Sequence, residues 1–214
     1  MDLRYLRENT DVVWEKTLEH LNLSLTALAI ALPLAIVLGI IATRVRWLTT
    51  PIVAAVSILY TIPSLAFMAF LIPSFGIGRQ PALIILVTYA QLFLVRNIVA
   101  GLKSVDPAVL EAARGLGMNE VQLFFRVWLP LATPVIVAGI RTALLAIIAM
   151  ATLTGFIRSG GLGELMFTGI GRDYPSQVLA GVIAVAALAI VTDLLMRVLE
   201  LFTPVARARR HATG

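Results

Sequence analysis

Five long apolar segments divide this chain of 214 residues and constrain its fold more than any other feature. A helix needs about 20 mostly apolar residues to cross roughly 30 Å of hydrocarbon, and each segment reaches that length. Only 14% of the residues are charged, against about 25% in ordinary soluble domains. We therefore predict an all-α membrane protein with five transmembrane helices. These helices are expected at residues 21–43, 52–72, 82–102, 131–156 and 178–202.

The composition argues against several other classes of protein. Without any Cys, the chain cannot form a disulfide or a Cys-based metal site. Its two His residues, His20 and His211, lie near opposite ends and form no ligand cluster. The net charge of +5 is spread between the apolar segments, so it does not indicate nucleic acid. We expect no catalytic residue, no metal and no cofactor bound by this chain, and membrane lipid as its surroundings.

A polar stretch at residues 106–130 separates the third and fourth apolar segments. Asp106 followed by Pro107 is typical of a helix start, because Asp can accept an N–H bond and Pro lacks the unpaired N–H of the first turn. Gly117 suits the left-handed position that ends a helix. Asn119 with Gln122 three residues later predicts a capping box and a second helix. The stretch is therefore predicted to form a helical hairpin.

The second helix of this hairpin is expected to lie against the membrane-embedded bundle. Val121, Phe124, Phe125 and Trp128 form an apolar stripe close to helical spacing. Leu129 and Pro130 are expected to stop the helix and turn the chain into the fourth span.

The hairpin carries Glu111, Ala112, Ala113, Gly117, Val127, Leu129 and Pro130. The spacing of these seven residues resembles the EAA loop of permease subunits of bacterial ABC importers. The resemblance implies that this cytoplasmic coupling loop contacts an ATPase. Small alanines would let the first helix enter a groove on that partner, and the acid would supply a charge. In the alternative interpretation, Glu111 pairs with Arg114 on a solvated face. The six coupling residues are Glu111, Ala112, Ala113, Gly117, Leu129 and Pro130.

A permease of this kind depends on other polypeptides. The only lysines are Lys16 and Lys103, and neither lies in a GxxxxGK[ST] phosphate-binding loop. ATP and Mg would therefore be used by a separate ABC ATPase subunit. The outward segments are too short for a substrate receptor, which predicts an external substrate-binding protein. Five helices are few to enclose a path, which predicts a second permease subunit, identical or related.

Three segments resemble the permeases of importers for the osmoprotectants glycine betaine, carnitine and choline. They are residues 60–78, 94–118 and 160–170, which include TIPS and GGLG. The resemblance implies a MetI-like permease fold and import of a compatible solute across a bacterial cytoplasmic membrane. Tyr60 and the QLFLVRN stretch depart from the expected pattern. A permease for methionine or another amino acid is the nearest alternative, and a self-sufficient secondary transporter or channel is a more distant one.

Two sets of residues are candidates for the translocation path or a gate. Pro63 removes a backbone donor within the second segment, and such breaks are tolerated where they face protein or a water-filled path. A packed kink is the alternative. The glycines of GGLG give the loop after the fourth segment a flexible backbone, suited to an outer gate or to an ordinary turn. The candidates are Thr61, Pro63, Ser64, Gly160, Gly161 and Gly163.

The distribution of charge predicts the orientation in the membrane. If the hairpin is cytoplasmic, that side carries more of the Lys and Arg residues, as the positive-inside rule requires. Residues 1–20 would then be extracytoplasmic, residues 21–203 would form the permease domain, and residues 204–214 would be a cytoplasmic tail. Arg96 and Arg141 are expected to have structural roles, and Asp193 is expected to pair with Arg197 four residues later.

Overall fold

A computed structural model describes residues 3–201, and all regular elements within this part of the chain are helical. Four of these helices are long and apolar enough to cross a membrane, and a bent pair supplies a fifth crossing if it counts as one span. The end of the last predicted segment and the predicted tail at 204–214 lie outside the described residues. The four long helices are α2 (Thr10–Arg44), α5 (Arg79–Lys103), the helix Glu120–Ile157 and α10 (Pro175–Leu201).

The first two spans differ from the sequence-based expectation. A short helix α1 (Arg4–Glu8) comes first, and α2 then begins at Thr10, because the polar residues before the apolar segment continue the same helix. The second span is not one helix. It consists of η1 (Arg46–Leu48), α3 (Thr49–Thr61) and α4 (Ser64–Phe75), with a bend of 90° before α4.

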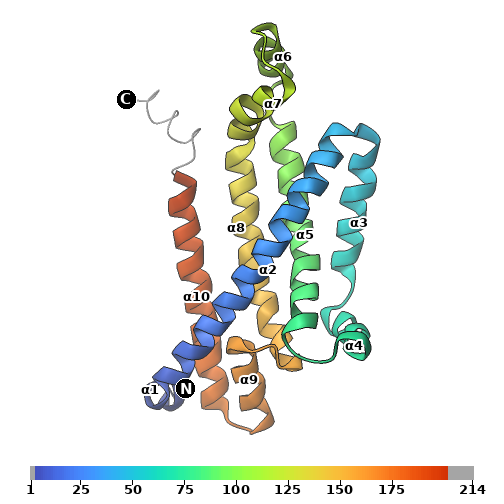
Figure 1. Ribbon diagram of the computed structural model, residues 1–214. Coiled ribbons are helices and arrows are strands. Elements are labelled where there is room, and N and C mark those ends of the chain that lie inside the picture. The colour runs from blue at the N-terminus through green and yellow to red at the C-terminus, as the bar shows by residue number, and fades with distance from the viewer. Residues whose placement is uncertain (1–2, 202–214) are drawn as a thin grey trace.

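Helix α5 lies at the centre of the bundle (Figure 1). Helix α2 crosses it diagonally, α8 (Leu129–Thr154) and α3 pack along it, and α10 packs beside α8. At one end of the bundle lie α1, α4 and α9 (Gly161–Gly171). At the opposite end, α6 (Pro107–Gly115) and α7 (Glu120–Leu123) project beyond the long helices. The two sets of candidate residues therefore lie at opposite ends of the molecule.

Helix α2 meets its neighbours through small residues at a spacing of four. Ala27, Ala31, Ala35 and Gly39 are all buried. Lipid tails are as apolar as Leu, so helices in a membrane associate through close packing and hydrogen bonds, which small residues permit. The amide of Gln91 on α5 uses this proximity and donates a hydrogen bond to the carbonyl oxygen of Ala31 at 3.1 Å.

Glycines set the distances of α2 and α8 from α5. A Cβ added at Gly39 of α2 would overlap the side chain of Ile98, and one added at Gly139 of α8 would overlap Asn97. Both neighbours belong to α5. The central helix is therefore held by its two partners at a separation that larger side chains would not allow.

We predict that Ala31→Leu lowers the melting temperature of the detergent-purified protein by several degrees. Overfilling a packed interface costs about 1–3 kcal/mol, and each kcal/mol corresponds to about 2–4 °C for a protein of this size. Ala29→Leu is the matched control, because Ala29 is exposed on the same helix. Equal melting temperatures for the two variants, measured by thermal unfolding, would contradict this packing.

Candidate functional site

The predicted hairpin is present, and local capping rules account for both of its helix starts. The Asp106 carboxylate accepts a hydrogen bond from the Ala108 N–H at 2.8 Å, at the start of α6. Gly117 adopts a positive φ of 81°, which ends this helix and reverses the chain. Asn119 and Gln122 exchange side-chain to backbone hydrogen bonds of 2.9 and 3.1 Å, which completes the predicted capping box.

The second arm of the hairpin does not turn at Leu129 and Pro130, so that prediction was wrong. Helix α7 continues through a π-helical turn, η2 (Phe124–Trp128), directly into α8. The N–H of Leu129 bonds to the carbonyl of Phe124, five residues earlier. Wider π-turns are common at functional sites and change which face a helix presents. The whole stretch Glu120–Ile157 is thus one long helix that leads from the hairpin through the bundle.

The apolar stripe that the spacing predicted is only partly buried. Val121 and Phe125 are exposed, at 67% and 62%, instead of facing the bundle. Leu123, which the pattern did not include, is fully buried. Phe124 and Trp128 do pack against the main core as predicted. Half of the stripe therefore points away from the bundle and is available to a partner.

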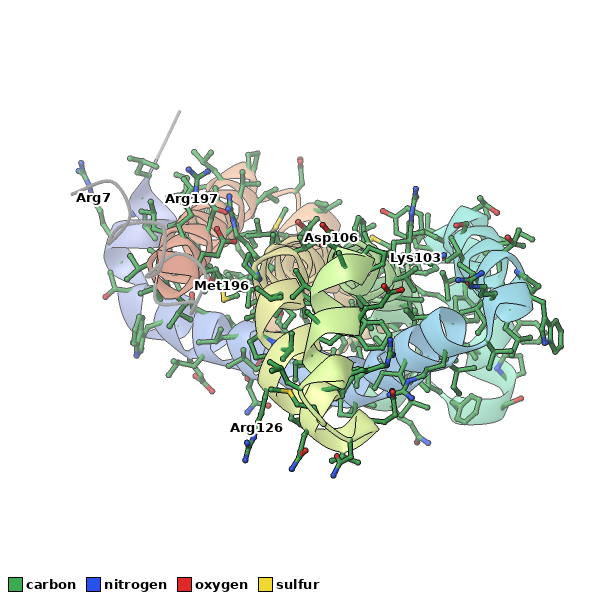
Figure 2. The ribbon with its side chains drawn as sticks, turned by 90° about the horizontal axis from the view of Figure 1, so that it is seen from above. Arg7, Lys103, Asp106, Arg126, Met196 and Arg197 are labelled. Atoms are coloured by element: carbon green, nitrogen blue, oxygen red, sulfur yellow. The ribbon has the colours of Figure 1, made fainter. Side chains whose placement is uncertain are left out.

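Several contacts fix the base of the hairpin to α2 and α5. The indole N–H of Trp128 donates to the carbonyl oxygen of Leu102 at 2.7 Å. The guanidinium of Arg44 lies over the Trp128 ring at 5.7 Å from its centroid, and 3.7 Å from the carboxylate of Glu120. In the view onto this end, Arg126 points away from the helices (Figure 2). Movement of the hairpin would therefore be transmitted to α2 and α5 through these contacts, and to α8 through the continuous helix.

The coupling candidates divide into exposed and packed residues. Glu111 and Ala112 are exposed on α6, whereas Ala113 is 5% exposed and packs inside the hairpin. Only one of the two alanines thus faces outward. Arg114 pairs with Glu120 at 3.0 Å rather than with Glu111, so the alternative interpretation was wrong. The carboxylate of Glu111 has no ion pair within the described residues.

The remaining coupling candidates are Gly117, Leu129 and Pro130, and four apolar residues of the hairpin are also exposed. Gly117 lies exposed at the tip, while Leu129 and Pro130 are half-buried at the base. Sequence patterns missed the exposed apolar residues of the hairpin, because apolar residues in amphipathic helices were assigned to the core. These residues are Val109, Leu116, Val121 and Phe125.

At the other end, the predicted interruption at Thr61, Pro63 and Ser64 separates α3 from α4. Pro63 has no N–H to continue the helix, and the Thr61 hydroxyl bonds back to the Ile58 carbonyl at 2.7 Å. The hydroxyl of Tyr89 donates to the carbonyl oxygen of Ile62 at 2.5 Å. The result is a sharp bend anchored to α5.

The glycines of the second candidate set have different roles. Gly160 and Gly161 adopt positive φ values of 88° and 73°, and the Gly161 N–H donates to the carboxylate of Glu19 at 2.9 Å. The ammonium group of Lys16 forms an ion pair with the same carboxylate, with an N–O distance of 2.7 Å. Gly163 packs so closely that a Cβ would overlap the main chain of Thr152 on α8. This loop is therefore clamped to α2 and α8.

The break and the glycine loop are neighbours in the fold. Ile157, just before the loop, is buried in one cluster with Met68 of α4 and Tyr89 of α5. The sequence placed these segments almost a hundred residues apart and gave no sign that they meet. They form a single candidate region at the end of the bundle opposite the hairpin.

Four charged side chains of α8 and α10 form ion pairs with one another. Arg197 pairs with Asp193 at 2.8 Å, as predicted, and Arg141 of α8 pairs with the same carboxylate at 2.6 Å. Arg141 also lies 3.4 Å from Glu200. Arg96 is exposed on α5. Within residues 3–201, no group of His, Asp or Glu side chains could hold a metal ion.

The bundle of long apolar helices with a projecting hairpin is the architecture of a membrane transport subunit. Residues 35–202 match the family described as the binding-protein-dependent transport system inner membrane component. The match extends over more than half of the sequence, and the chain belongs to this family, whose members are ABC importer permeases.

The curated relatives narrow the type of permease. The choline transport system permease protein OpuBB of Bacillus subtilis is 39% identical over 198 residues, covering 92% of this chain and 91% of the relative. The carnitine transport permease protein OpuCB of Listeria monocytogenes is 39% identical over 196 residues, covering 92% and 90%. The osmoprotectant import permease protein OsmW of Salmonella typhimurium is 37% identical over 208 residues, covering 94% and 97%.

Two solved structures confirm the predicted fold. A chain of the inward-facing MetNI methionine ABC transporter superposes with a TM-score of 0.72 at 21% identity, covering 87% of this chain and 95% of that one. A chain of an amino acid ABC transporter with histidines superposes with a TM-score of 0.74 at 18% identity, covering 97% and 99%. At these identities the likeness concerns the fold alone.

We predict that Gly163→Ala lowers the melting temperature, because the added methyl group must displace the main chain of Thr152. The expected loss is about 1–3 kcal/mol, as for other overpacked sites. Gly171→Ala at the end of the same helix is the control, since a Cβ there meets open space. If both variants unfold at the temperature of the unmodified protein, Gly163 is not needed for packing.

Proposed function

We propose that this chain is the permease subunit of an ATP-driven importer that carries a compatible solute across the bacterial cytoplasmic membrane. The solute class is glycine betaine, carnitine, choline or a related osmoprotectant. The observation that carries the proposal is the similarity to three permeases of such importers, at 37–39% identity and over at least 92% of this chain. These identities favour an osmoprotectant over the methionine alternative, since the methionine transporter chains that superpose on this fold are 21% and 25% identical.

The hairpin is proposed to couple transport to ATP hydrolysis. Glu111 offers an exposed carboxylate on α6 that has no ion pair within residues 3–201, and the same hairpin exposes the apolar side chains of Val109, Leu116, Val121 and Phe125. Apolar area with a few fixed charges is typical of the centre of a protein interface. The partner that fits is an ABC ATPase subunit, which would use ATP and Mg in place of this chain. In this division of labour the permease itself is not catalytic.

The long helix Glu120–Ile157 supplies a mechanism for that coupling. When the ATPase pair closes, the docked hairpin would move, and the helix would carry the movement to Thr152. There α8 touches Gly163 through the main chain, so the glycine loop would follow. A second contact, from Trp128 to Leu102, would pass the movement to α5 and from there to the break at Pro63. Thr61, Pro63, Ser64, Gly160, Gly161 and Gly163 are proposed to form the outer gate or path.

The proposed assembly contains three further proteins. A second permease subunit would complete the path, an ATPase would bind the hairpin, and an external substrate-binding protein would deliver the solute. This arrangement requires the hairpin and the C-terminus to be cytoplasmic, with the N-terminus outside. The loop clamped by Glu19 and the N-terminal helices would then face the substrate-binding protein.

The coupling proposal predicts that Glu111→Lys weakens binding of the ATPase about tenfold and lowers uptake. A hydrogen bond to a charged group contributes about 1.5–3 kcal/mol, and 1.4 kcal/mol corresponds to a factor of ten in affinity. Glu15→Lys is the control, because Glu15 is exposed near the other end of the bundle. Co-purification of the ATPase and ATP-dependent uptake measure the effect. Equal behaviour of the two variants would contradict the assignment of Glu111.

The transport proposal predicts ATP-dependent accumulation of at least one of glycine betaine, carnitine and choline in proteoliposomes that contain the complete importer. Radiolabelled solutes added with the substrate-binding protein provide the measurement, and methionine is the comparison. Accumulation of methionine alone would establish the amino-acid alternative. Solute flux through the purified permease without its ATPase would instead indicate a secondary transporter or channel.

A further inference from the structure

Four aromatic side chains gather around the break between α3 and α4. Tyr60 lies in the last turn of α3, Phe67 lies in the first turn of α4, and Tyr89 and Phe93 lie one turn apart on α5. The ring centroid of Tyr60 lies 5.5 Å from that of Tyr89 and 5.4 Å from that of Phe93. Phe67 lies 6.0 Å from Tyr89. We call these four residues the aromatic cluster.

The two tyrosine hydroxyls of the aromatic cluster differ. Tyr89 is almost fully buried, and its hydroxyl is occupied by the carbonyl of Ile62. Tyr60 is 38% exposed, and its hydroxyl has no hydrogen-bond partner within residues 3–201. A hydroxyl left unpaired in hydrocarbon is costly, and the polar end of a tyrosine in a membrane protein normally meets water or a polar group. Tyr60 is therefore suited to a surface that becomes wet during transport.

The electrostatics around the aromatic cluster favour a cation. Helix α3 ends at Thr61, so its last carbonyls and the negative end of its dipole lie at the break. Broken helices in transporters use such C-terminal ends to hold cations. The small cavity beside Tyr60, Tyr89 and Phe93 is lined only by uncharged side chains. A cation entering here would meet ring faces and carbonyl oxygens, with no positive side chain in the lining.

The cation that matches this lining is one that cannot donate hydrogen bonds. Few acceptors at the break are free, because the Ile62 carbonyl is already bonded to Tyr89 and the Ile58 carbonyl to Thr61. A quaternary ammonium group needs no acceptor, and aromatic rings attract it through their quadrupoles. We propose that the aromatic cluster is a transient site for the quaternary ammonium group of the solute on its way through the membrane. This inference rests on the proposed function and deepens it, since it places solute recognition within the permease itself.

The site is closed in this conformation. The cavity beside the rings has a volume of about 10 Å³, room for no more than one water molecule. The rings pack edge to face against one another, and such contacts are comparable in strength to a cation–π contact. Opening of the break would therefore exchange ring contacts for solute contacts with little net change. A site on a transport path must bind weakly enough to release its cargo.

Fluorinated phenylalanines incorporated at position 93 test the proposal with little change in ring size. Each fluorine withdraws charge from the ring face, so ATP-dependent choline uptake by the complete importer is expected to fall stepwise. The fully substituted ring should reduce it about 2- to 30-fold, the range that corresponds to typical cation–π interactions. The matched control is position 156, because Phe156 and Phe167 form a similar edge-to-face pair with centroids 5.5 Å apart, outside the cluster.

A stepwise fall at position 93 with no trend at position 156 supports the site. Unchanged uptake at position 93, or the same trend at both positions, would overturn it. A second variant pair separates ring chemistry from packing: Tyr60→Leu should raise the KM for choline more than Tyr60→Phe does, because only Phe keeps an aromatic face. Loss of uptake in Tyr60→Phe equal to that in Tyr60→Leu would also count against the proposal. Uptake by the unmodified importer tests the proposed function separately, so failure of one is distinguishable from failure of the other.

Discussion

Close packing of α2 and α8 on α5 is the constraint on which the other features depend. Apolar side chains gain little by leaving lipid for a protein interior, so a membrane bundle needs close contact and hydrogen bonds to hold together. Gly39 against Ile98 and Gly139 against Asn97 provide that contact. With the three helices fixed in this way, the hairpin at one end and the broken span at the other acquire defined positions (Figure 1).

The two ends are connected by continuous helices rather than by loops. From Glu120 to Ile157 the chain runs without a break from the hairpin to the loop before α9. Helix α5 runs in the opposite direction, from the end of the bundle that carries α4 to the base of the hairpin. Helices transmit displacement along their axes because each turn is hydrogen-bonded to the next. The same two helices would thus serve both as the core of the bundle and as the link between ATP hydrolysis and the proposed path.

Predictions from sequence were accurate where one or two turns of chain decide the outcome. The cap at Asp106, the positive φ at Gly117 and the capping box at Asn119 each depend on residues within four positions. The stripe was half wrong because helical spacing shows which residues share a broad apolar face, but not how much of that face the bundle covers. Val121 and Phe125 are exposed, although their spacing matched a buried face of a regular helix.

The sequence by itself determined the membrane class, the presence of the helices, the two helix starts of the hairpin and its turn at Gly117, and the resemblance to a permease family. Those properties follow from apolar length, local capping and short motifs, which need no partner from elsewhere in the chain. Only the tertiary structure decided the 90° bend, the pairing of Arg141 with Asp193 and the clamp on Gly161 by Glu19. The angle of the bend depends on contacts beyond the break itself, such as the bond from Tyr89 to Ile62, and the other two contacts join segments that lie far apart in sequence.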